Sequence, residues 1–372
     1  MVRINDWKDF GNWYLDLIAS KTAANEKIVA MAQEITMGTI TAKEKMDAIF
    51  EYCQKNVRYE QVYLEKGEFI PNDYQTILAR KYGDCKDYSL LMYVLAKSIG
   101  VNPNLALCYR GRGVKFYEDI TVSQFNHAIV YLNDAGHDYW YDSTNRIGIP
   151  GVTTKDLMNA TALILEQHNS RLTTIAESPD NKLQIEGAFT YKNKGLVGEI
   201  KISLFCQFAI DFFYEEMYLN KADMLSFLIK WTKMNINDEL IFKAISYQKQ
   251  DQRFIINATC EIPNAFLEID TCLYSSFARI FNRFFPEADK KFNPDQIFYF
   301  PYYNRIGIDL IFNNLSEPVA EVGLAAQQNF NWKYDYALPV GPFDQYQKAD
   351  FLTRWNLTIS EFNKTIKLLK KE

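Results

Sequence analysis

One cysteine of this chain stands where a helix is predicted to begin, between two aspartates. The segment KYGDCKDYSLLMYVLAKSIGV, residues 81–101, carries apolar side chains at helical spacing, and Gly100 marks the expected end of the helix. Asp84 is a typical N-cap, so Cys85 takes the first helical position, and Asp87 can complete a capping box. The helix N-terminus favours a thiolate at Cys85, whereas both carboxylates oppose it. The reactivity of this cysteine therefore depends on a base from another part of the chain.

Three histidines, His127, His137 and His168, are available as that base. His137 lies in the turn NDAGHD and His168 in the polar run EQHNSR, so both are interpreted as surface residues. His127 lies inside FNHAIVYL, whose alternating pattern predicts a strand. His127 is therefore the candidate base.

An aspartate on the next predicted strand, HDYWYDST, is expected to face this histidine. The turn NDAG, residues 133–136, joins the two strands, and if Leu132 pairs with His137, then Asp142 stands directly opposite His127. Facing residues of an antiparallel pair share one side of the sheet, with Cβ atoms roughly 4.5–5.5 Å apart. Asp142 could then hold one imidazole nitrogen and leave the other for a thiol, as in cysteine catalysis. A one-residue slip in register would move Asp142 to the other side.

A purely structural role is the alternative interpretation of these two residues. His127 would then be a core histidine with satisfied hydrogen bonds, and Asp142 a turn former ahead of Ser143 and Thr144. Their combination with a cysteine at a helix N-terminus favours the catalytic interpretation. Inert packing explains the remaining cysteines, which lie on apolar faces or in predicted strands: Cys53, Cys108, Cys206, Cys260 and Cys272.

Composition argues against several other classes of protein. The chain has 372 residues, of which 48 % are hydrophobic, and its net charge of −5 without a dense Lys/Arg block argues against nucleic-acid binding. No Cys-x-x-Cys pair, His-rich cluster or calcium loop predicts a metal site. The lone Gly-x-Gly of YRGRGV is interpreted as a turn and not as a phosphate loop, so no cofactor is expected.

No segment of the sequence predicts membrane insertion or export. No apolar stretch approaches the ~20 residues needed to span a bilayer. The opening MVRINDWKDFGNWYLDLIAS has charged residues where the apolar part of a signal peptide would run. The chain is thus expected to be either cytoplasmic or the mature part of an exported protein.

The sequence pattern around Cys85, His127 and Asp142 predicts helices and strands of an α+β fold in two domains. Helices are expected in NDWKDFGNWYLDLI, in TAKEKMDAIFEYCQKNV and from Cys85, followed by strands in NLALCYR, FNHAIVYL and DYWYDST. The segment AESPDNK, residues 176–182, is the predicted boundary between a domain of residues 1–177 and a β-rich domain of residues 178–372. The second is expected to be a β-sandwich-like domain with helical insertions. Its strands include EIKISLFCQFAI, and its helices are KADMLSFLIKWTKM and the closing ISEFNKTIKLLKKE.

The motifs KYGDCKD, FNHAIVYL and YWYDST together resemble the transglutaminase-like core of the papain-like cysteine peptidase superfamily. With VRY and FIPND they are similar to a bacterial subgroup in which a β-rich domain of unknown role follows the core. The resemblance covers roughly residues 5–175. It implies that Cys85 is the nucleophile, His127 the general base and acid, and Asp142 the orienting residue, with no cofactor.

Two departures from the subgroup stand out. Many of its members carry a further β-domain and an export signal before the core, which implies a possible periplasmic or exported location, and this sequence shows neither feature. Ser143 stands where proline is common after the aspartate. The resemblance also leaves the second oxyanion donor open, since the backbone N–H of Cys85 is only one candidate.

The expected function is cysteine-dependent acyl transfer on a peptide or protein substrate through a thioester. With water the enzyme is a peptidase or amidase, and with an amine co-substrate it is a transglutaminase. Hydrolysis is favoured because water is abundant and amine selection needs a shielded site. The rival hypothesis is a catalytically silent module that recognises peptide or glycan through the aromatic-rich second half.

Overall fold

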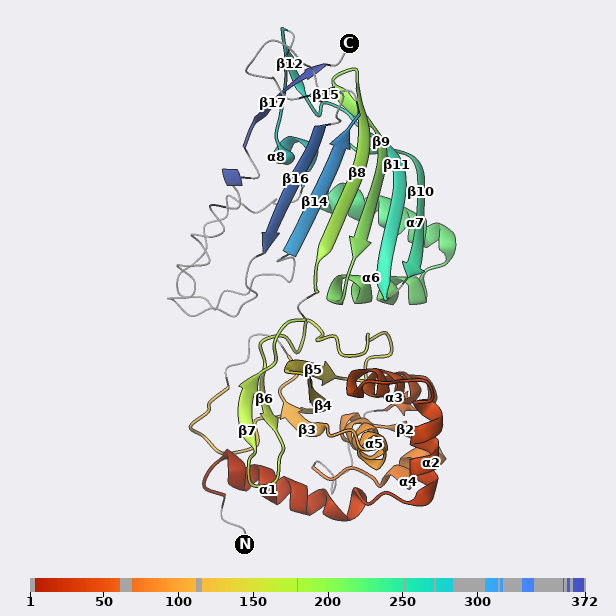
Figure 1. Ribbon diagram of the computed structural model, residues 1–372, viewed down its shortest axis with the longest axis vertical. Coiled ribbons are helices and arrows are strands. Elements are labelled where there is room, and N and C mark those ends of the chain that lie inside the picture. Colours follow the sequence, from red (N-terminus) through yellow and green to blue (C-terminus); the bar gives the residue numbers. More distant parts are fainter. Residues whose placement is uncertain are drawn as a thin grey trace. The chain divides into compact units, whose positions relative to one another are not determined.

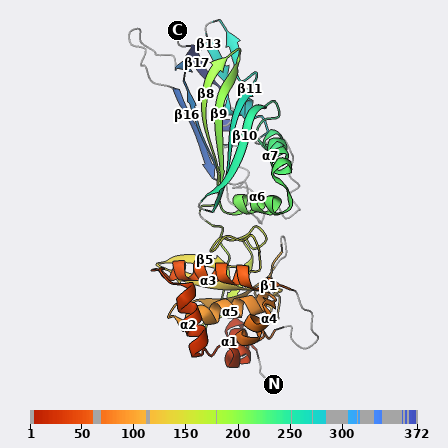
Figure 2. The same ribbon diagram turned by 90° about the vertical axis from the view of Figure 1, so that its right-hand side faces the viewer.

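The computed structural model describes residues 4–60, 69–111, 116–178, 180–250, 252–270, 272–283, 305–313, 315–316, 330–337, 357, 360–361 and 364–370. The chain folds into two compact units, Met1–Pro179 and Asp180–Glu372. Each unit has its own sheets and helices, which Figures 1 and 2 show from two sides. No helix of the described ranges is long and apolar enough to cross a membrane.

The first unit is built around a helix that packs against an antiparallel sheet. That helix is α5 (Cys85–Ser98), which contacts β3 and β4 of the sheet as well as α2 and α3. Residues on several of its sides, such as Leu91, Val94 and Leu95, are fully buried, which places α5 in the core. The other helices are α1 (Trp7–Ile18), a short 3-10 helix (Ala19–Lys21), α2 (Glu26–Ile35), α3 (Ala42–Asn56) and α4 (Tyr74–Arg80).

The sheet of the first unit has the order β5-β4-β3-β6-β7, and all neighbouring strands are antiparallel. Its strands are β3 (Asn104–Cys108), β4 (His127–Asp134), β5 (His137–Tyr141), β6 (Thr161–Ile164) and β7 (Arg171–Thr174). A separate parallel pair, β1 (Arg58–Tyr59) and β2 (Tyr82–Gly83), leads directly into α5. The helix from Cys85 and the three strands β3, β4 and β5 confirm the predictions from sequence.

The second unit contains a six-stranded sheet with the order β10-β11-β9-β8-β14-β16, in which only β14 and β8 run parallel. Helix α6 contacts β11 and helix α7 contacts β10. A smaller sheet has the order β12-β13-β17-β15. The elements are β8 (Leu183–Lys192), β9 (Gly195–Leu204), α6 (Gln207–Tyr218), α7 (Lys221–Asn235), β10 (Ile241–Gln250), β11 (Arg253–Ile262), β12 (Leu267–Ile269), β13 (Cys272–Ser275), α8 (Phe277–Ile280), β14 (Arg305–Phe312), β15 (Leu315–Ser316), β16 (Phe330–Ala337) and β17 (Ile366–Lys370).

Two expected elements of the second unit are wrong. EIKISLFCQFAI is not one strand, because β9 ends at Leu204 and Cys206, at φ 51°, is the N-cap of α6. The C-terminal segment forms a strand over Ile366–Lys370 where a helix was predicted. There Leu368 is fully buried opposite Leu273 of β13, so pairing with a distant strand overrides the local helical pattern.

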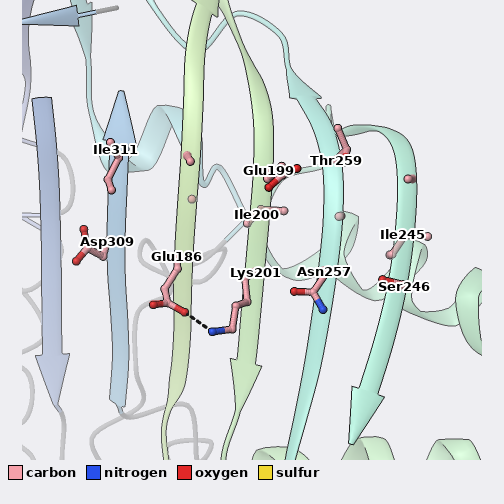
Figure 3. A pocket seen from close by; sticks show the side chains of 14 residues that line it. Glu186, Glu199, Ile200, Lys201, Ile245, Ser246, Asn257, Thr259, Asp309 and Ile311 are labelled. Atoms are coloured by element: carbon pink, nitrogen blue, oxygen red, sulfur yellow. Dashed lines mark ion pairs between the residues drawn. The ribbon is translucent and has the colours of Figure 1, made fainter. Parts of the chain in front are cut away.

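One side of the six-stranded sheet carries a polar surface. Glu186, Lys201 and Asn257 stand on neighbouring strands at facing positions and point to the same side (Figure 3). They line a groove of about 540 Å³ whose other walls include Ser246 and Asp309. The strands bury the alternate residues, as their period of two requires.

Candidate active site

Cys85 is the first residue of α5, held there by a capping box. Asp84 Oδ1 accepts hydrogen bonds from the backbone N–H groups of Lys86 (3.0 Å) and Asp87 (3.3 Å), and Asp87 Oδ2 accepts one from the N–H of Asp84 (3.3 Å). Gly83 permits this tight turn, because a Cβ atom there would lie 2.6 Å from the Cβ of Asp87. The predicted helix start is therefore confirmed, and it leaves the Cys85 side chain half-buried.

Both carboxylates next to the cysteine have cationic partners. Lys86 Nζ lies 2.5 Å from Asp84 Oδ2, and Arg80 Nη2 lies 2.5 Å from Asp87 Oδ2. Asp87 is almost completely buried and also accepts a hydrogen bond from the N–H of Asn72 (2.7 Å). These cationic partners offset the negative charges of Asp84 and Asp87, which were expected from the sequence to disfavour a thiolate at Cys85. Arg80 and Asn72 were missed because neither lies in the helix.

His127 lies at the start of β4, where it pairs with Cys108 of β3, and it is 6 % exposed. Its Nε2 lies 2.9 Å from Asp142 Oδ2, which leaves Nδ1 on the other side of the ring. Burial lowers the pKa of His127, but the Asp142 carboxylate and a hydrogen bond with Cys85 raise it to about 9 in total. The imidazole therefore carries a positive charge at neutral pH.

Asp142 follows directly after β5, and the structure corrects the register that predicted its place. Asp134 pairs with His137 across a two-residue turn in which Ala135 and Gly136 both have positive φ, so the strands are shifted by two residues from the expected pairing. A shift of two keeps every side chain on its side of the sheet. Asp142 consequently still reaches His127, as a diagonal neighbour.

The Asp142 carboxylate is held in its charged form. It accepts hydrogen bonds from Thr144 through the hydroxyl (2.6 Å) and the backbone N–H (3.2 Å). Burial by itself raises the pKa of Asp142, but His127 and then Arg110 and Thr144 lower it below the ordinary range of an aspartate. The carboxylate is thus available to orient the imidazole and to stabilise its positive charge.

Arg110 is a residue of this site that sequence reasoning missed. Its Nη1 lies 3.6 Å from Asp142 Oδ2, and its Nε lies 2.5 Å from Asp156 Oδ2. Asn126 Oδ1 accepts a hydrogen bond from the Arg110 backbone N–H (2.6 Å), which fixes the chain just before His127. Arg110 belongs to YRGRGV, which was interpreted only as a turn. Its position two residues beyond β3, the strand that pairs with His127, was the available signal.

A small cavity of about 90 Å³ joins Cys85 and His127. Its walls come from α1, the start of α5, β3, the start of β4 and the segments that precede α4 and β4. The lining residues are Tyr14, Phe69, Cys85, Lys86, Leu107, Ser123, Phe125, Asn126, His127 and Ala128. The structure thus brings the three candidate residues together, with His127 in contact with Asp142 on one side and facing the cavity with Cys85 on the other.

The other candidates lie elsewhere. His137 is exposed on β5, and His168 is exposed at φ 61°, as expected for surface residues. In the part of the chain that the structure describes, no group of three or more His, Cys, Asp or Glu side chains is arranged to hold a metal ion.

Comparisons with known proteins find one family whose model matches part of this chain. The model of the transglutaminase-like superfamily matches residues 29–141. A crystal structure of a candidate protease from Parabacteroides distasonis aligns with a TM-score of 0.43 and 12 % identity, covering 96 % of this chain and 58 % of that chain. A candidate cysteine protease from Cytophaga hutchinsonii aligns with a TM-score of 0.26 and 16 % identity, covering 44 % and 57 %. No curated protein matches this sequence.

The chain therefore spans less than two thirds of the length of either solved structure. The sequence-based resemblance to the transglutaminase-like superfamily is confirmed over residues 29–141, a range that contains Cys85 and His127 and ends one residue before Asp142. The predicted α+β class, with helices against an antiparallel sheet, is confirmed as well.

Proposed function

We propose that this chain, whose residues 29–141 match the transglutaminase-like superfamily, is a cysteine-dependent acyl-transfer enzyme. Cys85 is the nucleophile, His127 the general base and acid, and Asp142 the residue that orients the imidazole. The observation that carries the proposal is the double engagement of His127. Its Nε2 lies 2.9 Å from Asp142 Oδ2, and its ring shares a cavity with Cys85. A nucleophile, a base and an orienting group in this order are what cysteine catalysis requires.

The protonated imidazole serves two purposes in the first step. Its positive charge stabilises a thiolate on Cys85, and its proton is available for the leaving group. The sulfur attacks the carbonyl carbon, a C–S bond forms, and the π electrons move to oxygen. When the intermediate collapses, the C–N bond breaks, His127 gives its proton to the amine, and a thioester remains on Cys85.

The second step decides the type of reaction. Water attacks the thioester while His127 takes its proton, and the carboxylic acid leaves as the C–S bond breaks. An amine in place of water would give a transamidation product. We propose hydrolysis of a peptide or protein substrate, because selection of an amine over abundant water needs a shielded second site. Residues 1–177 are the proposed catalytic domain, and residues 178–372 are the proposed β-rich domain, to which no role is assigned.

The other cysteines support Cys85 as the reactive thiol. Burial raises the pKa of Cys53 and Cys108 far above that of an ordinary thiol and the pKa of Cys260 to about 12. All three side chains are inaccessible. Cys85 is instead half-buried at a cavity and next to a charged imidazole.

The test is selective labelling followed by product analysis. At about pH 6, where an ordinary thiol is almost fully protonated, dilute iodoacetamide should alkylate Cys85 first, as located by mass spectrometry of tryptic peptides. A peptide library incubated with the protein should then yield cleaved peptides, with and without a fluorescent primary amine as competitor. Cleavage without amine incorporation is the expected result.

Two controls make the test decisive. Cys85→Ala should abolish cleavage, whereas Cys272→Ala in the second unit should leave it unchanged. If amine-tagged peptides formed instead of cleaved ones, the proposed reaction would be transamidation and not hydrolysis. Alkylation of Cys85 at the rate of the other cysteines would refute its role as the nucleophile, and selective alkylation without any product would favour a peptide-binding or glycan-binding module.

A further inference from the structure

Acyl transfer at Cys85 requires hydrogen-bond donors for the oxyanion, and the start of α5 provides one. The capping box uses the N–H groups of Asp84, Lys86 and Asp87, while the first residue of a helix has no intrahelical partner. Among the described residues, nothing accepts a hydrogen bond from the N–H of Cys85. This group can therefore point at a substrate oxygen. Oxyanion holes commonly combine such an N–H with a second donor.

A tyrosine of α1 forms another part of the same cavity. Tyr14 is 3 % exposed and lines the cavity together with Cys85 and His127. Its hydroxyl has no hydrogen-bond partner among the described residues, although a buried phenol usually has one. The described side-chain atoms that are fully enclosed without a partner are Thr154 Oγ1 and Asp309 Oδ1. The Tyr14 hydroxyl is not among them, so it keeps access to open space, and the cavity is the space that Tyr14 lines.

The ionisable groups that act on Tyr14 belong to the start of α5, which lines the same cavity. Burial raises the pKa of Tyr14 most, followed by the influence of Cys85, Asp84 and Asp87. These three residues form the N-cap and first turn of α5. The hydroxyl consequently remains protonated across the physiological range and is a donor there, in the neighbourhood of the reactive sulfur.

We propose that the hydroxyl of Tyr14 is the second oxyanion donor of this site, acting together with the backbone N–H of Cys85. The inference rests on the proposed acyl-transfer function. When the sulfur of Cys85 bonds to a carbonyl carbon, the π electrons move to oxygen, and the two donors hydrogen-bond that oxygen without giving up their protons. The electrons return when the leaving group departs. Tyr14 lies outside residues 29–141, so the family match does not assign it.

The test uses two small electrophiles, of which only one needs an oxyanion hole. Acylation of Cys85 by p-nitrophenyl acetate passes through a tetrahedral oxyanion, and its leaving group departs without a proton from His127. Alkylation by iodoacetamide is a direct substitution at carbon and forms no oxyanion. Tyr14→Phe should slow acylation by about 100-fold, as loss of one donor does elsewhere, and change alkylation by less than about two-fold.

Tyr52→Phe is the matched control. Tyr52 lies on α3, packs against the core of the first unit and is not part of the cavity wall. This variant should leave both rates unchanged. An equal loss of both rates in Tyr14→Phe would mean that Tyr14 only positions α5, and unchanged rates would mean that it contributes no donor. Either result overturns the inference, as does a selective loss of acylation in Tyr52→Phe.

Failure of the proposed function would look different. In that case p-nitrophenyl acetate would not acylate Cys85 of the unmodified protein faster than its other cysteines. Circular dichroism and thermal unfolding of Tyr14→Phe should match those of the unmodified protein, because the substitution keeps the ring and removes one oxygen atom.

Discussion

The groove of the second unit and the cavity of the first unit are both lined by charged side chains, and they differ in how deeply those charges are buried. The groove on the six-stranded sheet measures about 540 Å³, whereas the cavity at Cys85 measures about 90 Å³. In the groove, Lys201 lies 2.9 Å from Glu186 across neighbouring strands. In the first unit, His127 lies 2.9 Å from Asp142. The two ion pairs thus have the same separation, although one lies in an open groove and the other in the interior of the first unit.

Burial makes the difference between the two pairs. The side chains of Lys201 and Glu186 are 47 % and 52 % exposed, so water screens their attraction. Those of His127 and Asp142 are 3 % and 5 % exposed, and their attraction raises the pKa of His127 to about 9 after the opposing effect of burial. A candidate site is therefore better recognised by buried, perturbed ionisable groups than by the volume of a hollow.

The largest effect should come from removal of the base. His127→Ala eliminates both the proton donor and the charge next to Cys85, and general acid–base catalysis contributes about 10²–10⁴-fold to a rate. Peptide cleavage should fall by about that range, as measured by product analysis. Alkylation of Cys85 at pH 6, located by mass spectrometry, should slow as well because the thiolate loses its charge partner. His137→Ala, on the exposed end of β5, is the control and should have no effect. Equal cleavage and alkylation rates in His127→Ala and the unmodified protein would contradict the role of His127 as the base. The buried pair at the Cys85 cavity would then be no more functional than the exposed pair in the groove.

A smaller effect is expected when the orienting carboxylate is neutralised. Asp142→Asn keeps the imidazole but removes the charge that holds it, so acyl transfer should fall by roughly ten-fold, or about 1.4 kcal/mol in activation free energy. Asp138→Asn is the control. Asp138 lies on the same hairpin, but its carboxylate accepts hydrogen bonds from Tyr131 and Asn133 and not from His127. A loss in Asp142→Asn as large as that in His127→Ala would mean that the base cannot work without the carboxylate.

Stability should depend on pH through the same buried pair. The folded pKa of His127 is raised from 6.5 to about 9, so its stabilising contribution is complete below about pH 6.5 and is lost as pH rises through 9. The lowered pKa of Asp142 adds stability that is lost only in acid. The free energy of unfolding should thus fall between pH 6.5 and 9.5, by up to about 3 kcal/mol. Urea denaturation should show a flatter dependence for Asp142→Asn, and an unchanged slope would contradict the pairing.

Local sequence patterns predicted the parts of the site that local contacts determine. The capping residues Asp84 and Asp87 lie within one turn of Cys85, and the alternation of β4 and β5 is visible without knowledge of their partners. The expected register was wrong by two residues, since Ala135 takes the positive φ that a two-residue turn requires. The candidate pair survived this error because a shift of two does not change the side of the sheet.

Long-range contacts account for what the sequence did not reveal. Arg110 reaches Asp142 and Asp156 across loops, and Tyr14 reaches the cavity from a helix more than 60 residues before Cys85, so no spacing rule connects them. The strand Ile366–Lys370 depends on β13 and β15 in the same way. Periodicity identifies an element, but it does not identify which distant element it meets.

The smallest effect is expected in the open groove of the second unit. Lys201→Ala removes the cross-strand pair with Glu186, and an exposed ion pair contributes about 0.2–1 kcal/mol. Thermal unfolding should therefore change by only a few degrees, and 0.5 M salt should reduce even that difference by screening, while alkylation and acylation of Cys85 stay unchanged. A loss of more than about 2 kcal/mol, or any effect on Cys85, would show that the groove charges are coupled to more than their neighbours. The contrast between a screened pair and a buried pair at the same distance would then need another cause.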